Sequence, residues 1–475
     1  MAKTFFFYDL ETSGLNARDD RIMQFAGQRT DQDFSPIGEP INIMIKLSDD
    51  TLPSPGALMV TGITPQKTVY EGYSELEFCK IFYEQIATSD TTIVGFNNVR
   101  FDDEFIRAIL WRSYFDPYQW SYSEGRSRWD MLDVIRMTRA LRPDGIKWPV
   151  VDGKATNRLE LLTKENNISH DNAHDALSDV KALIAITKLI AEQQPRLFNY
   201  LLSIRNKNEI KKLVSFENPQ SFVYTSGRYS QQYQKTTIAY PLAPAEHGNV
   251  LVYDLHHDPE PWLRLSAEEI KKIVETPYAE RGDDYVGLPV KKLQYNRCPA
   301  VAPIGVLDSH DGWKRLDLSK EIINQRIAKL KTSSDFIKRV SDLLNAKAKY
   351  SNNIEPEASL YDDFVTPKDN LRMEAIRNAT ANELKKITAN FADKRLASML
   401  PRYKAYNAPS AMTDVEREQY DKFRRQRIAR QEPAFIKDMS YFLKKNDLSD
   451  HQQFVLEELQ LWYQSIVPSV DDMSD

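Results

Sequence analysis

The chain has 475 residues, of which 41% are hydrophobic and 28% are charged, so it can bury a core and is not a disordered polymer. At roughly 100–200 residues per domain, this length predicts about two to four domains. The 63 lysine and arginine residues against 68 aspartate and glutamate residues give a net charge of −5, which excludes a uniformly basic nucleic-acid coat but not a local basic groove.

The region up to Pro195 alternates strand-like and helix-like segments. Runs rich in aromatic and β-branched residues predict strands at 4–10, 24–28, 41–47 and 92–96. Apolar residues at helical spacing predict helices at 74–87, 101–111 and 175–194. Strands interleaved with helices in this way predict an α/β layer fold.

The pattern changes after Pro195. Short β-like runs at 222–224, 250–253 and 286–290, separated by glycine-containing turns, predict a compact β-barrel or an α+β module over residues 200–305. Further along, apolar residues recur at helical spacing in segments 319–331, 333–349, 381–392, 414–430 and 448–466. Residues 350–369 form the most loop-like connection. We therefore predict domains at 1–195, 200–350 and 355–475.

The cysteines and the N-terminal run indicate the cellular compartment. Cys79 and Cys298 lie far apart and have no CxxC partner, which argues against a disulfide framework or a structural zinc site. No stretch approaches the roughly 18–20 apolar residues of a membrane helix. The apolar run at 4–7 leads into Tyr-Asp-Leu-Glu, not into the small residues of a signal-peptide cleavage site. The sequence predicts a soluble, cytoplasmic protein.

Two acidic residues end the first predicted strand. Asp9 and Glu11 are two positions apart, so both carboxylates project from the same face of the strand. They stand at its C-terminal end, where open α/β sheets place their sites. Adjacent carboxylates repel each other unless a cation lies between them, and their hard oxygen atoms suit Mg²⁺ or Mn²⁺. An isolated pair of this kind is nevertheless common without a metal.

Two later segments offer further groups of the same chemistry. Asp102 or Asp103 stands where the strand at 92–96 leads into a helix, although acids in a first helical turn are often simple caps. His174 stands at the start of the helix at 175–194, and Asp179 lies within its first turns. An imidazole beside a helix-anchored carboxylate suits a general base next to a metal ligand.

Together these residues resemble the DEDDh 3′→5′ exonuclease superfamily, which has a ribonuclease-H-like fold. Residues 174–179 match its pattern His-x-Ala-x-x-Asp. His170 and Asp175 have the same spacing as His174 and Asp179, but they do not match the full pattern. The third acid of the superfamily directly follows the phenylalanine of an Asn-x-x-Phe-Asp segment, which selects Asp102. Asp103 is then a residue that begins the helix.

The resemblance extends to the bacterial exodeoxyribonuclease I family over residues 4 to 465. The segments that carry it are TGITPQ (61–66), GFNNVRFDDE (95–104), SRWDMLDV (127–134), QPRLF (194–198), LPVKK (288–292), NRCP (296–299), DKRL (393–396) and PRYKA (401–405). It implies an α/β fold with a DEDDh exonuclease domain, an SH3-like β-barrel domain and an α-helical C-terminal domain. One departure is Tyr406, where members usually carry arginine, so no family role carries over to this position.

The family implies a single-stranded-DNA-specific 3′→5′ exonuclease that releases 5′-mononucleotides and acts in DNA repair and recombination. Asp9, Glu11, Asp102 and Asp179 would hold two Mg²⁺ ions, with Mn²⁺ as a substitute, and His174 would take the proton of the attacking water. The alternatives are a DEDDh exoribonuclease or proofreading-type nuclease, and a non-catalytic nucleic-acid-binding scaffold. The large region beyond the first domain argues against the former, and the complete set of acids and histidine argues against the latter.

Basic residues near aromatic ones predict where the strand binds, because a chain of negative net charge must bind nucleic acid through local clusters. The candidates are Arg128, Arg142, Lys291, Lys292, Arg297, Lys394, Arg395 and Arg402. The basic residues at 417–430 could also serve this purpose, but a charge run on a helix is more often a solvated face. The family also implies single-stranded DNA-binding protein as a partner, whose acidic, hydrophobic-ended tail suits a basic rim around an apolar pocket. We expect a monomer without membrane contact.

Overall fold

The computed structural model describes residues 3–467, apart from 171–174, 283, 347–354 and 389. The chain folds as two compact units. The first unit contains residues 1–127, 170–184 and 351–475, and the second contains 128–169 and 185–350. The predicted domains at 1–195 and 355–475 therefore contribute to one unit. The division into three domains stays a prediction.

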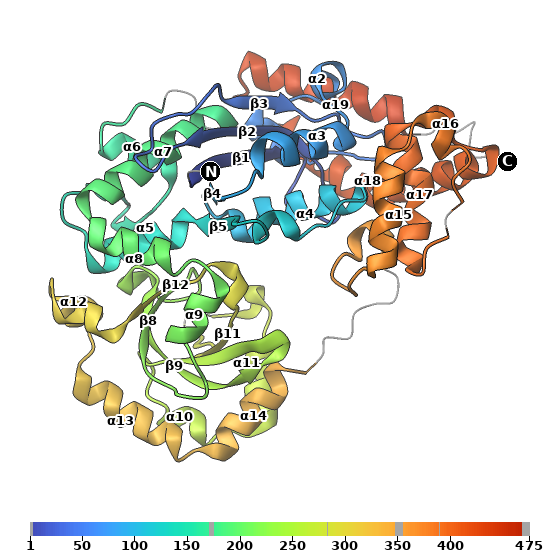
Figure 1. The fold of residues 1–475 in the computed structure, drawn as a ribbon. Helices are drawn as coiled ribbons and strands as arrows, with labels where there is room; N and C mark the ends of the chain where they lie inside the picture. Colours follow the sequence, from blue (N-terminus) through green and yellow to red (C-terminus); the bar gives the residue numbers. More distant parts are fainter. Residues whose placement is uncertain (1–2, 171–174, 283, 347–354, 389, 468–475) are drawn as a thin grey trace. The chain divides into compact units, whose positions relative to one another are not determined.

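A five-stranded sheet has the order β3-β2-β1-β4-β5 (Figure 1). Its strands are β1 (Thr4–Thr12), β2 (Ile22–Thr30), β3 (Ile41–Met44), β4 (Thr91–Gly95) and β5 (Ser127–Asp130). Strand β1 pairs antiparallel with β2 and parallel with β4, and its aromatic residues Phe5 to Tyr8 are buried. A strand buried on both faces reads as a continuous apolar run, as this one does. The predicted strands are confirmed, with β3 shorter than expected.

Helices from both ends of the chain belong to the first unit. They are α1 (Pro55–Thr61), α2 (Pro65–Glu71), α3 (Glu75–Ile81), α4 (Asp102–Arg112), α15 (Pro367–Asn378), α16 (Ala381–Leu384), α17 (Lys394–Asn407), α18 (Asp414–Phe442), α19 (Asp450–Ile466) and the start of α7 (Ala176–Gln193). Phe78 of α3 and Ile106 of α4 share one apolar cluster with Phe25 of β2. A second cluster joins Leu58 of α1 to Phe435 of α18. The C-terminal helices thus complete the core of the N-terminal sheet.

The second unit contains an antiparallel five-stranded sheet of order β11-β10-β9-β8-β12. Its strands are β8 (Phe222–Thr225), β9 (Thr236–Ala245), β10 (Asn249–Asp254), β11 (Val290–Leu293) and β12 (Ala300–Pro303). Its helices are α5 (Met131–Leu141), α6 (Leu159–Glu165), the rest of α7, α8 (Pro195–Ser203), α9 (Lys207–Leu213), α10 (Glu260–Leu263), α11 (Ala267–Glu275), α12 (Gly312–Arg315), α13 (Lys320–Lys331) and α14 (Ser334–Leu344), beside a short hairpin of β6 (Val150–Val151) and β7 (Lys154–Ala155). The β-rich module predicted for this region is confirmed.

Several predicted boundaries were wrong, and proline accounts for most of them. Strand β9 was not predicted because it contains Pro241 and Pro244, which are rare inside strands. Helix α17 was missed, with Pro401 inside it, and α18 continues through Pro433 to Phe442 instead of ending near residue 430. Burial of one helix face offsets the hydrogen bond that proline removes. The predicted helix at 381–392 shrinks to α16. Among the described helices, none is both long and apolar enough to cross a membrane.

Candidate metal centre

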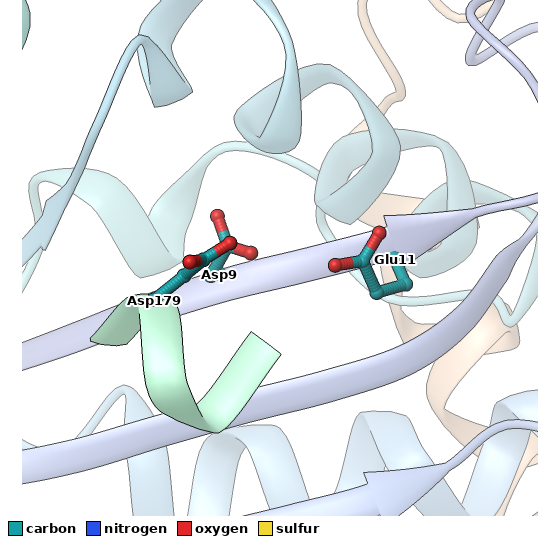
Figure 2. Close-up of side chains that lie close together, drawn as sticks. All are labelled: Asp9, Glu11 and Asp179. Atoms are coloured by element: carbon teal, nitrogen blue, oxygen red, sulfur yellow. The ribbon is translucent and has the colours of Figure 1, made fainter. Parts of the chain in front are cut away.

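Strand β1 places Asp9 and Glu11 on the same side of the sheet, as their spacing predicts. Asp9 pairs with Ala26 and Glu11 with Gln24 in the antiparallel register with β2, and the register shifts directly after Glu11. The parallel pairing with β4 reaches only as far as Phe7, so both acids lie beyond it. Figure 2 shows the two carboxylates projecting from the strand. Both side chains are partly buried.

Asp179 joins these two acids from the first turns of α7. The carboxylate of Asp175 accepts a hydrogen bond from the backbone N–H of Ser178 at 3.0 Å, and the N–H of Asp179 donates to the carbonyl of Asp175 at 3.0 Å. Asp175 therefore serves the start of the helix, and Asp179 points toward β1 (Figure 2). One carboxylate oxygen from each of Asp9, Glu11 and Asp179 lies within 4.8 Å of the other two.

The two neighbouring acids of α4 have different surroundings. Asp103 is buried, and its carboxylate accepts hydrogen bonds from the hydroxyl of Tyr8 at 2.6 Å and from Nδ2 of Asn98 at 3.2 Å. Asp102 is not one of the three acids within 4.8 Å of one another, but its charge raises the pKa of both Asp9 and Glu11. Asp103 thus connects α4 to β1, while the charge of Asp102 acts on the acidic cluster.

The cluster concentrates negative charge. Burial raises the pKa of Asp9 well above its usual range, and Asp102, Glu11 and Asp179 raise it further. Burial also raises the pKa of Glu11 to about 8, with Asp179 and Asp102 as the next causes. Carboxylates that repel each other in this way favour the presence of a cation, and their oxygen atoms are the ligands of hard divalent ions. The residues present therefore fit a divalent metal.

The two candidate histidines have different outcomes. His174, the predicted base, lies outside the described residues, so its role stays a prediction. His170 is described, and its side chain is only 4% exposed. Its Nε2 lies 2.5 Å from Oδ1 of Asp179. Spacing in the sequence paired His170 with Asp175, whereas the fold places it against Asp179. A histidine beside a metal-ligating carboxylate commonly orients that ligand.

The predicted strand-binding residues of the second unit make contacts within it. Arg128 donates to the carbonyl of Asn296 at 2.7 Å, and Arg142 donates to the carbonyl of Val306 at 2.8 Å. The remaining three are Lys291, with Nζ over the Tyr224 and Tyr229 rings at 4.4 and 4.3 Å, Lys292, with Nζ 3.2 Å from Glu246, and the partly buried Arg297. Their role in binding nucleic acid stays a prediction.

In the first unit, Lys394 is exposed, whereas Arg395 and Arg402 are held by neighbours. Arg395 forms an ion pair with Asp393 at 2.6 Å and lies over the Trp111 ring at 5.1 Å. Arg402 forms an ion pair with Glu355 at 2.6 Å. These two arginines contribute to the packing of the C-terminal helices, and their contact with a nucleic acid also stays a prediction.

Acids on a central strand, at the start of α4 and on α7 form an arrangement that is typical of metal-dependent exonucleases of the DEDDh class. Family models match three successive regions: "Exonuclease" at residues 6–187, "Exonuclease I SH3-like domain" at 205–346 and "Exonuclease I C-terminal domain" at 354–466. The chain belongs to the exodeoxyribonuclease I family, and it is an exonuclease.

Curated relatives match nearly the whole chain. Exodeoxyribonuclease I of Haemophilus influenzae is 36% identical over 460 residues, which cover 96% of this chain and 97% of that protein. Exodeoxyribonuclease I of Escherichia coli is 37% identical over 426 residues, which cover 89% of each.

Solved structures agree with the fold. E. coli Exonuclease I in complex with a dA16 oligonucleotide has a TM-score of 0.92 at 34% identity, covering 98% of this chain and 100% of that chain. A moderately thermophilic Exonuclease I from Methylocaldum szegediense has a TM-score of 0.91 at 34% identity, with the same coverage. A zinc-ion-bound form of the E. coli complex with single-stranded DNA has a TM-score of 0.92 at 34% identity, again with the same coverage.

Proposed function

We propose that this protein is a single-stranded-DNA-specific 3′→5′ exonuclease that releases 5′-mononucleotides by two-metal phosphodiester hydrolysis. The observation that carries the proposal is the group of Asp9, Glu11 and Asp179, whose carboxylate oxygens lie within 4.8 Å of one another. Solved relatives bind single-stranded DNA oligonucleotides, which supports the same substrate here. The acids of the group repel one another when ionised, so they are suited to hold cations next to a phosphodiester.

The residues of the site divide into metal ligands, a general base and residues that position them. Asp9, Glu11, Asp102 and Asp179 hold two Mg²⁺ ions, for which Mn²⁺ can substitute. The chemistry that the bound ions supply is activation of a water molecule and stabilisation of the departing 3′ oxygen. His174 takes the proton of the attacking water. The hydrogen bond from Tyr8 to Asp103 fixes the first turn of α4 against β1, so it sets the position of Asp102 relative to Asp9.

His170 orients Asp179 in this scheme. An ionised Asp179 only accepts hydrogen bonds, so Nε2–H of His170 donates to it across the 2.5 Å contact. That proton holds one carboxylate oxygen and leaves the other for a cation. A histidine that donates Nε2–H to a carboxylate is not placed to take a proton from water through the same nitrogen. The assignment of His174 as the base and His170 as a positioning residue follows from this.

The proposal also covers the pathway, the location and the partners of the enzyme. The enzyme acts in DNA repair and recombination as a cytoplasmic monomer, and single-stranded DNA-binding protein recruits it through an acidic tail. Arg128, Arg142, Lys291, Lys292, Arg297, Lys394, Arg395 and Arg402 remain the candidates for contact with the strand. The family resemblance supports these statements.

Release of mononucleotides from 3′-labelled and 5′-labelled single-stranded DNA tests the proposal. The parent and an Asp9→Ala variant are compared with and without Mg²⁺, and single-stranded RNA of the same sequence is run alongside. We expect immediate loss of the 3′ label from DNA, only with metal and only in the parent. Release that persists in Asp9→Ala would place the metal site elsewhere, and faster degradation of RNA would favour an exoribonuclease.

A further inference from the structure

The loop that connects β1 to β2 begins two residues after Glu11. It spans residues 13–20 and is closed by paired contacts at its base, where the N–H of Ser13 donates to the carbonyl of Arg21 at 2.8 Å and the N–H of Arg21 donates to Oγ of Ser13 at 2.9 Å. Within the loop, the carboxylate of Asp20 accepts a hydrogen bond from the N–H of Asn16 at 2.8 Å. These hydrogen bonds join the two ends of the loop directly after β1.

Helix α18, from the other end of the chain, grips this loop through Arg427. Nη2 of Arg427 donates to the carbonyl oxygen of Asp19 in the loop. Its Nε lies 3.1 Å from the carbonyl of Asp50 and 3.3 Å from Oδ2 of the same residue. The side chain of Arg427 is 1% exposed, so these contacts are made without competition from water.

A buried ion cluster surrounds Arg427 and includes the first residue after the loop. Arg21 lies 2.9 Å from Glu357 and 3.6 Å from Asp50, and Arg427 lies 3.8 Å from Glu357. Burial alone would raise the pKa of Asp50, but Arg427 and Arg21 hold it well below its usual range. The C-terminal segment thus holds both ends of the loop, Asp19 through Arg427 and Arg21 through Glu357.

Tyr406 completes the cluster at the position where the family resemblance gave no role. Its hydroxyl lies 2.8 Å from Oδ2 of Asp50 and 3.2 Å from Oε1 of Glu357. Burial raises the pKa of Tyr406 well above its usual range, and the two carboxylates raise it further, so the hydroxyl stays protonated and donates. Tyr406 therefore orients the two acids that Arg427 and Arg21 contact.

Polar residues of α18 also contact the segment at 49–54, which is hydrogen-bonded to the start of the loop. Arg424 pairs with Asp49 at 3.1 Å, and Oε1 of Gln431 accepts from the N–H of Leu52 at 2.8 Å. The N–H of Ser54, at the end of that segment, donates to the carbonyl of Ser13 at 2.7 Å. A continuous path of short contacts therefore leads from α18 to the residue that follows the metal-centre strand.

We propose that Arg427 is a positioning residue for the metal centre, which fixes the loop at 13–20 and through it the end of β1 that carries Glu11. This inference rests on the proposed function, because it takes Glu11 as a metal ligand. The polar contacts of Arg427 are with Asp19, Asp50 and Glu357, none of which belongs to the acids of the metal centre. Arg427 acts by holding Glu11 at the distance from Asp179 that the metal needs, so the C-terminal helices set the rate of cleavage. Mutation of residues that position metal ligands commonly lowers activity or metal affinity by about 10–100-fold.

Arg427→Lys in the full chain is the primary test. Lysine keeps the positive charge but, as a compact ammonium, lacks the fork that reaches Asp19 and Asp50 together. We expect kcat on single-stranded DNA to fall about 10–100-fold, with KM for the strand changed less than about twofold. A merely structural role would lower thermal stability without this split between kcat and KM.

A second readout does not depend on turnover. Binding of Mg²⁺ to the folded enzyme raises its melting temperature, and the Mg²⁺ concentration for half of that rise reports metal affinity. We expect Arg427→Lys to need about 10–100-fold more Mg²⁺ than the parent. Tyr406→Phe removes only a hydroxyl and should shift both readouts in the same direction, by about three- to tenfold. If Arg427→Lys does not fold, Tyr406→Phe decides the question.

Two further variants make the result unambiguous. Val455→Ala in α19 removes apolar contacts from a fully buried position of the same unit, and it should lower thermal stability while keeping the kcat and the Mg²⁺ requirement of the parent. Asp179→Asn should abolish both cleavage and the response to Mg²⁺. An active Asp179→Asn would overturn the proposed function. An inactive Asp179→Asn together with parent-like kcat and Mg²⁺ requirement in Arg427→Lys and Tyr406→Phe would overturn the positioning role alone.

Discussion

Among its described residues, the first unit contains two clusters of buried or partly buried acids whose environments shift their pKa values in opposite directions. In the metal centre, burial and neighbouring carboxylates raise the pKa of Asp9 and Glu11. In the ion cluster, arginines outweigh burial and lower the pKa of Asp50 and Glu357. The chemistry of the side chains is the same, so the difference lies in the charge of their neighbours. The acids of the metal centre repel one another, and a bound cation would reduce that repulsion. The acids of the ion cluster are neutralised by arginines of the protein itself.

The largest expected difference between the clusters is in catalysis. Asp179→Asn should lower cleavage of single-stranded DNA at least about 100-fold, because it removes a metal ligand. The melting temperature without metal should stay equal or rise, since one of three mutually repelling carboxylates becomes neutral. Single-turnover cleavage and calorimetry of the same metal-free sample provide the two measurements. A clear loss of metal-free stability would show that the acids are not in net repulsion.

The ion cluster should respond in the opposite way, through stability. Asp50→Asn removes one of the two buried carboxylates that neutralise Arg21 and Arg427 and leaves only Glu357, so it should lower the free energy of unfolding by about 3–5 kcal/mol. The adjacent Asp49→Asn is a matched control, because the Asp49 side chain is 52% exposed and its pair with Arg424 contributes at most about 1 kcal/mol. Urea denaturation measures both variants. Equal losses would mean that Asp50 is not specially paired.

Variation of pH should separate the two clusters without mutation. Glu11 has an ordinary pKa of 4.5 and a folded pKa of about 8, so the folded protein binds more protons than the unfolded chain between these values. Stability of the metal-free enzyme should therefore fall as pH rises from about 4.5 to 8. Asp50 and Glu357 have lowered folded pKa values, so their contribution is present above their unfolded pKa and is lost as pH falls below it.

Glu11→Gln is the control for the pH prediction. This variant should show a smaller decline of stability between pH 4.5 and 8, because the raised pKa of Asp9 still contributes but that of Glu11 does not, while it keeps the loss in acid. Denaturant midpoints of both proteins across this range, in the presence of a chelator, provide the measurement. A parent whose stability rises over the same range would contradict the raised pKa of Glu11.

The histidines test how the metal centre is supported. His170→Gln should lower kcat by about tenfold and raise the Mg²⁺ requirement by a similar factor, because Asp179 loses an orienting donor. His174→Ala should retain strand binding and lose cleavage, as expected for the base. Binding of a labelled oligonucleotide and its cleavage are measured on each variant. Normal cleavage in His174→Ala would overturn the assignment of the base, and with it the argument that His170 only orients Asp179.

The smallest expected effects come from removing single basic side chains, either exposed or paired within the protein. Lys394→Ala should weaken binding of single-stranded DNA uniformly across sequences and reduce the salt slope by about 1, because Lys394 is exposed on α17. Arg395→Ala should instead lower thermal stability, because that guanidinium pairs with Asp393 and stacks on Trp111. Binding titrations at several salt concentrations distinguish the two. An unchanged slope in Lys394→Ala would remove this residue from the candidates.

Local patterns were sufficient where the determining contacts are local. The two-residue spacing of Asp9 and Glu11 and the helix that carries Asp179 were predicted, and the structure places their oxygens together. The preference for Asp102 over Asp103 came from the family pattern, and the bond from Tyr8 to Asp103 is consistent with it. Strand-binding residues were predicted from basic residues near aromatic ones, a pattern that does not tell an exposed cation from one paired within the protein. Arg395 and Arg402 show this limit.

The charge run at 417–430 was interpreted as solvated surface or as part of a strand-binding face, and for the buried Arg427 neither is correct. Arg427 is buried against Asp50, and Arg424 pairs with Asp49. Helical spacing of polar residues looks the same whether that face meets water, nucleic acid or another part of the chain. The partners lie more than 370 positions away in sequence, so no local pattern could reveal them.

The sequence by itself determined the class of fold and the family, and it predicted the acids of the candidate metal centre. These depend on strand and helix periodicity and on motifs of a few residues, which short stretches of chain specify on their own. Only the tertiary structure decided that His170 contacts Asp179, that Tyr406 joins Asp50 and Glu357, and that Arg427 holds the loop after Glu11. Such contacts form when packing of the core brings distant segments together, and burial then makes their pairing obligatory.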